Sequence, residues 1–259
     1  MSRIAIITVA GISSRFNKGI TENQKVLKCL FNEGDERSTL LFQMLQKVEY
    51  SDIIIIVGGY KYDDLKKYIE TIIPSEMKRK ISLVYNEHYE DLSSGYSLYL
   101  GLKEAFAISE DIRDILFVEG DLDIDRDSLN TVIDSDSSVL TYNYEPIKAD
   151  KAVVLFVDGD GQYNYAFNSS HGLLSIMSPF SAIYNSGQTW KFKDIDAIKA
   201  ANDLFGAEHR DGTNLVIIQE YLNRVEKDMV SVLPLKRWTN CNTREDYNRI
   251  KEAWDNENS

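Results

Sequence analysis

"ITVAGISSRFNKG", residues Ile7 to Gly19, joins an apolar run to a loop with polar and basic residues. The apolar run predicts a buried strand, and Gly11 lets the chain turn sharply where that strand ends. Backbone N–H groups in such a turn can point at phosphate oxygens, and Arg15 offers a two-pronged donor for a polyphosphate. By itself the stretch fits a nucleotide-binding loop and an ordinary strand-to-helix turn equally well.

Apolar runs and amphipathic stretches alternate through the first half of the chain, which predicts a parallel sheet covered by helices. We expect helix N-caps at Ser38 and at Ser93 or Ser94. The expected strands are Ile4–Val9, Ile53–Val57, Ile81–Tyr85 and Ile115–Val118, and the expected helices are Thr39–Val48, Tyr62–Ile72 and Gly95–Phe106.

The second half begins with short strands and turns and continues with helices. The expected strands are Val139–Asn143, Ala152–Val157, Tyr163–Asn168, Leu173–Met177 and Val230–Leu233. The expected helices are Ser178–Thr189, Ile195–Leu204, Asn214–Val225 and a last helix that Thr243 opens with Asp246 in a variant capping box.

This order predicts an α/β fold with a Rossmann-like, mixed but mostly parallel central sheet flanked by helices. We expect one domain over residues 1–259, with a nucleotide-binding half at 1–125 and an acceptor-binding half at 126–259. Ligands of such sheets bind at the carboxyl ends of the strands. The loops after Val9 and Val118 should therefore face the same crevice.

Composition excludes several function classes. The 259 residues are 43% hydrophobic, enough for a full core, and the net charge of −12 argues against a nucleic-acid binder. No apolar run approaches the ~20 residues of a membrane span, and no signal peptide opens the chain, so we expect a cytoplasmic protein without membrane contact. Cys29 and Cys241 lack the spacing of a zinc site and are expected to be reduced.

An acidic run, "FVEGDLDID" at Phe117 to Asp125, follows the strand expected around Ile115. Magnesium prefers oxygen ligands and keeps several waters, so one or two carboxylates beside substrate phosphates suffice to hold it. Asp121, at the end of the strand, is the first candidate ligand, and Asp123 lies two residues further along. The alternative is a solvated acidic turn.

The separate signals fit one family. "TVAGISSRF" followed by "QKVL" resembles the GT-A-like nucleotidyltransferases that make sugar and alditol nucleotides, whose opening AAG-x-G-[ST]-R-[FM] run precedes Pro-Lys-x-Leu. "NCNTREDY" at Asn240 to Tyr247 is similar to their D-x-[DN]-T-P-E-D-[LY] run. The resemblance implies that Arg15 and Lys25 grip the triphosphate as catalytic residues, and that Asp121 and Asn242 bind Mg²⁺. It also implies nucleotide contacts by the loop residues Ala10, Gly11, Ser13, Ser14 and Arg15 and by Lys25.

A second stretch narrows the resemblance. "YEDLSSGYSLYLGLKEA", from Tyr89 to Ala105, resembles the bacterial choline-phosphate cytidylyltransferases. This likeness implies that Ser97, with the backbone near Ser94 and Gly95, binds the base. The alternative is a helix start capped by serines.

The chain also departs from the family pattern. Ser13 stands in place of the second loop glycine, Gln24 in place of the proline before Lys25, and Thr8-Val9 in place of Leu-Ala. Since a left-handed backbone favours glycine, we expect Ser13 to adopt another conformation.

The expected function is a Mg²⁺-dependent cytidylyltransferase that joins CMP from CTP to phosphocholine or a similar compound such as 2-aminoethylphosphonate, releasing pyrophosphate. The sequence assigns no acceptor-binding residue, and a homodimer stays open as an assembly. Aromatic residues of the second half, such as Tyr142, Tyr144 and Tyr184, are expected in core or surface positions rather than in a cage for a quaternary ammonium.

Three alternatives stay open. The first is a sugar-1-phosphate nucleotidyltransferase that uses UTP or dTTP. The second is a nucleotide-binding homologue with weak or no turnover. The third is a dinucleotide-dependent reductase, which the Tyr-x-x-x-Lys spacing of Tyr62 and Lys66 suggests, although the full G-x-G-x-x-G run is missing.

Overall fold

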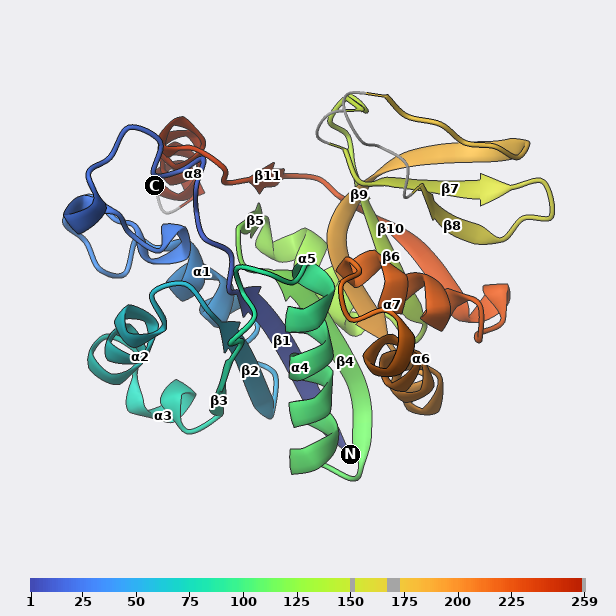
Figure 1. Ribbon diagram of the computed structural model, residues 1–259, viewed down its shortest axis with the longest axis horizontal. Helices are drawn as coiled ribbons and strands as arrows, with labels where there is room; N and C mark the ends of the chain where they lie inside the picture. Colours follow the sequence, from blue (N-terminus) through green and yellow to red (C-terminus); the bar gives the residue numbers. More distant parts are fainter. Residues whose placement is uncertain (150–151, 167–172, 258–259) are drawn as a thin grey trace.

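A nine-stranded mixed sheet forms the centre of the computed structural model, which describes residues 1–149, 152–166 and 173–257. Seven strands follow the order β10-β6-β9-β4-β1-β2-β3, and β7 and β8 extend the sheet from β9. Helices lie on both faces (Figure 1). The predicted α/β class, with a mostly parallel sheet flanked by helices, is confirmed.

The first half contains the parallel part of the sheet. Strands β1 (Ser2–Val9), β2 (Ile53–Gly58), β3 (Ile81–Tyr85) and β4 (Ile112–Glu119) are parallel neighbours. The helices of this half are α1 (Leu40–Lys47), α2 (Tyr62–Thr71), α3 (Ser75–Lys78) and α4 (Ser94–Ile108), and short 3-10 helices cover Glu22–Gln24 and Lys28–Leu30.

The expected N-cap at Ser38 is wrong by one residue. Thr39 caps α1, because its hydroxyl oxygen accepts a hydrogen bond from the Phe42 amide at 3.1 Å. The Ser38 hydroxyl donates to Asp35 instead. At α4, Ser93 holds the N-cap position.

The second half completes the sheet. Its strands are β6 (Ser138–Asn143), β7 (Val154–Asp158), β8 (Tyr163–Ala166), β9 (Phe180–Phe192) and β10 (Val230–Leu235), and a separate antiparallel pair is formed by β5 (Leu122–Ile124) and β11 (Trp238–Asn240). Its helices are α5 (Arg126–Asp134), α6 (Ile195–Glu208), α7 (Asn214–Leu222) and α8 (Arg244–Glu257), with a 3-10 helix at Lys227–Met229. Helices α3 and α5 and strands β5 and β11 are not predicted from the sequence.

The expected strand at Leu173–Met177 and the expected helix at Ser178–Thr189 are both wrong. Residues 173–177 have no regular structure, and Phe180–Phe192 is a strand that pairs antiparallel with β4, β6 and β7. Only glycine fits at position 187 of this strand, since a Cβ there would lie 2.6 Å from Thr141 Oγ1 and from Leu235 Cδ1. Part of the strand expected at Tyr163–Asn168 falls outside the described residues, and the described part ends at Ala166.

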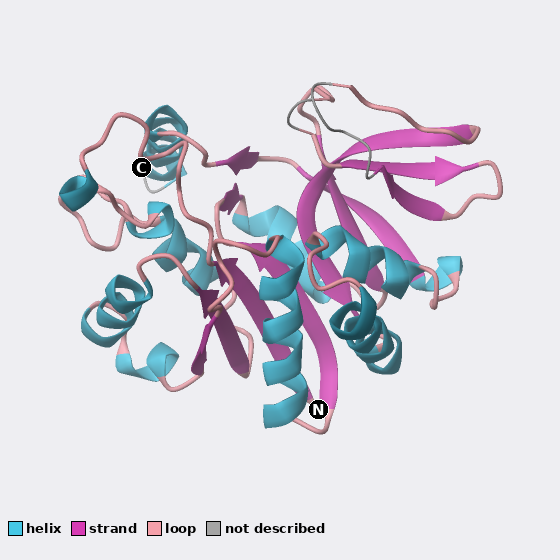
Figure 2. Cartoon of the chain, viewed as in Figure 1, coloured by secondary structure: helices cyan, strands magenta, loops and turns pink. Residues whose placement is uncertain are grey.

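Two apolar layers sandwich the sheet, and alternate residues of β1 point into each of them. Ala5 and Ile7 belong to the layer under α1, α2, α5 and α8, and Ile4 and Ile6 belong to the layer under α4, α6 and α7. Figure 2 shows helices on either side of the strands. The parallel strands are therefore buried on both faces, as their near-continuous apolar sequences predict.

The last helix returns to the first half of the chain. Tyr247 of α8 donates to the Ser38 carbonyl at 2.8 Å, and its ring packs edge-on against Phe31 with 4.9 Å between centroids. Figure 1 shows α8 beside the loops that follow β1. Asp246 and Thr243 form the expected reciprocal cap, since each side chain accepts from the other's amide.

Among the helices of the described residues, none combines the length and the apolar character needed to cross a membrane.

Candidate functional site

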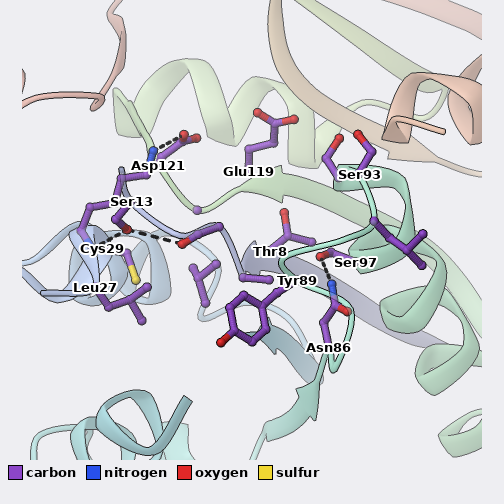
Figure 3. Close-up of a pocket in the computed structure, with 17 residues that line it drawn as sticks. Thr8, Ser13, Leu27, Cys29, Asn86, Tyr89, Ser93, Ser97, Glu119 and Asp121 are labelled. Atoms are coloured by element: carbon purple, nitrogen blue, oxygen red, sulfur yellow. Dashed lines mark hydrogen bonds and ion pairs between the residues drawn. The ribbon is translucent and has the colours of Figure 1, made fainter. Parts of the chain in front are cut away.

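A cavity of about 240 Å³ lies where β1 and β4 end and α4 begins. The expectation that the loops after Val9 and Val118 share one crevice is confirmed, because both contribute to the wall. Figure 3 shows Ser13 and Asp121 at one end of the cavity and Asn86 and Ser97 at the other. The wall is formed by Thr8, Val9, Ala10, Gly11, Ser13, Leu27, Lys28, Cys29, Asn86, Tyr89, Leu92, Ser93, Ser94, Ser97, Glu119, Gly120 and Asp121.

Ser13 adopts a left-handed conformation, with a φ of 55°. The expectation that it would avoid this region is wrong. The side chain is buried, and its hydroxyl accepts from the Lys28 amide at 3.2 Å and donates to the Gly11 carbonyl at 3.4 Å. These hydrogen bonds offset the strain that a non-glycine residue meets at positive φ.

Asp121 forms an ion pair with Lys28 at one end of the cavity. Lys28 Nζ lies 2.6 Å from Asp121 Oδ2, whereas Asp121 Oδ1 is buried and has no hydrogen-bond partner among the described residues. A buried carboxylate oxygen without a partner is costly unless a ligand satisfies it.

The segment that carries Asn242 lies beside Asp121. The pairing of β11 with β5 brings the Cys241 amide to 2.8 Å from the Asp121 carbonyl oxygen, and Asn242 is the next residue. Asn242 Oδ1 is also buried without a partner in the described part of the chain. The two expected metal ligands therefore lie on adjacent stretches of backbone, and each keeps one unsatisfied oxygen.

Asp123 is not available to a ligand. It is 1% exposed, and its carboxylate accepts from Lys47 Nζ at 3.0 Å and from Trp254 Nε1 at 2.9 Å, with Arg237 as a further partner. Its role is to hold α1 and α8 against β5. In the described ranges, no three His, Cys, Asp or Glu side chains cluster as a ready-made metal site.

Glu119 occupies the middle of the cavity wall. Burial and the neighbouring charge of Asp121 raise the pKa of the Glu119 carboxyl to about 8. The hydrogen bond from Asn214 and the charge of Lys28 oppose this rise. Asn214 Nδ2 donates to Glu119 Oε1 at 2.7 Å, and Ser94 Oγ donates to Asn214 Oδ1 at 3.3 Å. Hydrogen bonds thus join the end of β4 to the first residues of α4 and α7.

The far end of the cavity is neutral and well packed. Asn86 Nδ2 donates to Ser97 Oγ at 2.9 Å, and both residues are at most 5% exposed. Gly95 does not line the cavity, and packing accounts for it: a Cβ there would lie 2.4 Å from the Gly212 carbonyl oxygen. Gly11 differs, since no heavy atom lies within 4 Å of the position that its Cβ would take.

Arg15 and Lys25 do not reach the cavity wall. Arg15 is exposed, as is its neighbour Ser14, and Lys25 Nζ pairs with Glu22 at 2.5 Å. Both stay predicted ligands of the triphosphate. The site residues predicted from the sequence do not include Lys28, Asn86, Glu119 or Asn214. Glu119 nevertheless stands in the quoted "FVEGDLDID", and Asn86 directly follows a predicted strand.

Several solved structures of nucleotidyltransferases share this fold. The CTP:phosphocholine cytidylyltransferase of Streptococcus pneumoniae is 18% identical, with a TM-score of 0.64 over 98% of this chain and 100% of that chain. The inositol-1-phosphate CTP transferase of T. maritima is 15% identical, with a TM-score of 0.65 over 97% of each chain. A UDP-glucose pyrophosphorylase solved with UDP-glucose is 11% identical, with a TM-score of 0.67 over 99% of this chain and 100% of that one. At these identities the likeness establishes the fold.

Sequence similarity identifies a family but no curated relative. None of the curated proteins matches the chain. Residues 24–254 match the family described as Domain of unknown function (DUF6564), and the match runs from before α1 into α8 and includes most of the cavity wall. The chain belongs to this family.

Proposed function

We propose that this protein is a metal-dependent nucleotidyltransferase, which transfers a nucleoside monophosphate from a triphosphate to the phosphate of a small acceptor and releases pyrophosphate. The observation that carries the proposal is the buried Asp121 oxygen at the end of the cavity, which has no partner among the described residues. Asn242, which does not line the cavity but follows the residue whose amide binds the Asp121 carbonyl, keeps a second such oxygen. The shared fold of the solved nucleotidyltransferases supports it.

Asp121 and Asn242 fit a hard divalent cation, since carboxylate and amide oxygens are ligands that Mg²⁺ accepts. Two protein ligands suffice where substrate phosphates and water complete the coordination. When bound, Mg²⁺ would supply charge neutralisation at the α-phosphate. Asp121 and Asn242 would fix its place, and the Cys241 amide would hold the Asp121 backbone.

The loop of residues 10–15 would bind the phosphates. The open space around Gly11 favours close approach of a ligand to the backbone, because packing gives no reason for a glycine there. Arg15 would move from its exposed position onto the β- and γ-phosphates, and Lys25 would move from outside the cavity onto the α-phosphate. No protein nucleophile is needed, since the acceptor is an anion that attacks phosphorus directly.

The base would lie at the neutral end, near Ser94 and Ser97. Ser97 is already fixed by Asn86, so a hydrogen bond to the base would require little reordering. CTP is the leading nucleotide because the stretch from Tyr89 to Ala105 resembles choline-phosphate cytidylyltransferases. The leading acceptors are phosphocholine and 2-aminoethylphosphonate.

A second candidate is transfer from UTP or dTTP to a sugar 1-phosphate. The UDP-glucose pyrophosphorylase with a TM-score of 0.67 favours it, because its fold is at least as similar as that of the cytidylyltransferases.

Both candidates are tested by measuring pyrophosphate release from the four ribonucleoside triphosphates and dTTP. Each nucleotide is combined in turn with phosphocholine, 2-aminoethylphosphonate, inositol phosphate or glucose 1-phosphate. We expect turnover with CTP and a choline-type acceptor that requires Mg²⁺. Turnover only with UTP or dTTP and a sugar phosphate would favour the second candidate. Nucleotide binding by calorimetry without pyrophosphate from any pair would contradict both and favour a binding protein without turnover.

A further inference from the structure

Lys28 is an unusual member of the cavity wall. Among the described residues that line the cavity, it is the only one with a cationic side chain. Its ammonium is 2.6 Å from Asp121 Oδ2, and the two side chains are 19% and 21% exposed. The carboxylate expected to bind the metal is therefore already neutralised by the protein itself.

The backbone fixes Lys28 in this position. Its amide donates to the buried hydroxyl of Ser13, and its neighbours Leu27 and Cys29 are each 2% exposed. Lys25, three residues earlier, shows the contrast: its ammonium lies outside the cavity and pairs with Glu22. Lys28 is thus directed at Asp121 by the same left-handed serine that departs from the family pattern.

We propose that Lys28 is a positioning residue that makes divalent-metal binding at Asp121 depend on the nucleotide. The inference rests on the proposed function, since it takes Asp121 as the metal ligand. Without nucleotide, the ammonium holds Oδ2 and repels a second cation at Oδ1, and this repulsion is strong because the site is mostly shielded from water. A triphosphate supplies anionic oxygens that attract the ammonium, which releases the carboxylate to the metal.

Electron paramagnetic resonance of Mn²⁺, recorded on the full chain with and without CTP, tests this dependence without measuring turnover. In the absence of CTP, we expect Lys28→Met to bind Mn²⁺ roughly tenfold or more tightly than the parent protein. With CTP present, the difference should vanish or reverse. Lys66→Met, which removes an equal charge from the exposed face of α2, should leave Mn²⁺ affinity unchanged.

Two further variants make the result specific. Lys28→Arg keeps a cation beside Asp121 and should bind Mn²⁺ as weakly as the parent protein. Lys28→Gln also removes the charge and serves if the methionine variant folds poorly. The double variant Lys28→Met with Asp121→Asn should lose the gained affinity.

The outcomes separate the two proposals. Equal Mn²⁺ affinity of the parent protein and Lys28→Met without CTP, with strong binding once CTP is added, overturns the inference and leaves the proposed function in place. If no form binds Mn²⁺ even with CTP or UTP, the metal-dependent function and the inference both fall.

Discussion

The two ends of the cavity differ in how their polar groups are satisfied. At the charged end, formed by Ser13, Lys28 and Asp121, a carboxylate oxygen is buried without a partner in the described part of the chain. At the neutral end, formed by Asn86 and Ser97, the two side chains are hydrogen-bonded to each other. The neutral end is preorganised by the protein, whereas the charged end is complete only with a ligand.

This difference predicts different outcomes of substitution. Changes at the charged end should affect turnover and metal binding with little effect on the free energy of unfolding. Changes at the neutral end should affect stability and nucleotide affinity together.

Asp121→Asn is expected to have the largest effect. Loss of the carboxylate removes the anionic metal ligand, and we expect kcat for pyrophosphate release to fall on the order of 10³-fold or more, since metal catalysis supplies several kcal/mol. Circular dichroism should show an unchanged melting temperature. Asp127→Asn, an equal charge change on the exposed first turn of α5, is the control and should keep full activity. An Asp121→Asn protein with unimpaired turnover would contradict the assignment.

Alanine substitutions of two glycines test the same comparison through the free energy of unfolding. Gly95→Ala places a methyl group 2.4 Å from the Gly212 carbonyl oxygen and 2.6 Å from Phe205 Cζ, and we expect a loss of about 2 kcal/mol in the free energy of unfolding. Gly11→Ala meets no heavy atom within 4 Å, so its urea midpoint should stay the same while its KM for the nucleotide rises. A destabilised Gly11→Ala protein would show that the loop is held by packing rather than kept open for a ligand.

The sequence predicts the parallel half of the fold well. Strands such as Ile53–Gly58 are buried on both faces and appear as unbroken apolar runs, and amphipathic helices such as α2 keep their period. Asp121 could be predicted as a cavity residue for the same reason, because it follows a strand whose end is clear from the sequence.

The features that the sequence does not predict depend on contacts between residues far apart in the chain. Phe180–Phe192 becomes a strand because β4, β6 and β7 supply partners, and local spacing carries no trace of them. Lys28 and Asp121 are 93 residues apart, so no local pattern joins them. The family resemblance pointed to Lys25, which matches the motif, rather than to Lys28, whose amide donates to a serine 15 residues earlier in the chain.

Ser97→Ala tests the neutral end with a smaller expected change in the free energy of unfolding than Gly95→Ala. The change leaves Asn86 Nδ2 buried without its partner, which should cost about 1 kcal/mol in the free energy of unfolding. If Ser97 also contacts the base, KM for CTP should rise roughly five- to tenfold, an effect of the same size as one hydrogen bond. Ser75→Ala, at an exposed position of α3, is the control. A lower stability with unchanged KM would restrict Ser97 to a structural role.

Asp125→Asn tests the scaffold behind the charged end and is expected to have the smallest effect. Asp125 Oδ1 accepts from the Ser128 amide at 2.8 Å and caps α5, and Oδ2 accepts from the Arg237 amide at 2.9 Å, just before β11 and Asn242. Burial opposes ionisation of this carboxyl, but the two amide hydrogen bonds outweigh it and lower its pKa. The charged form therefore stabilises the fold at neutral pH.

A carboxyl whose pKa is lowered by folding contributes stability above its unfolded value, near 3.9, and loses that contribution as the pH falls through the folded value. We expect Asp125→Asn to lose about 1 kcal/mol in urea unfolding at pH 7, a figure reduced for partial solvent screening. The gap between the variant and the parent protein should narrow below about pH 4. Asp136→Asn, at an exposed position, is the control. If the stability difference between the variant and the parent protein stays constant from pH 7 to pH 3, Asp125 acts through the shape of its side chain and not through its charge. The segment leading to Asn242 would then be held independently of pH.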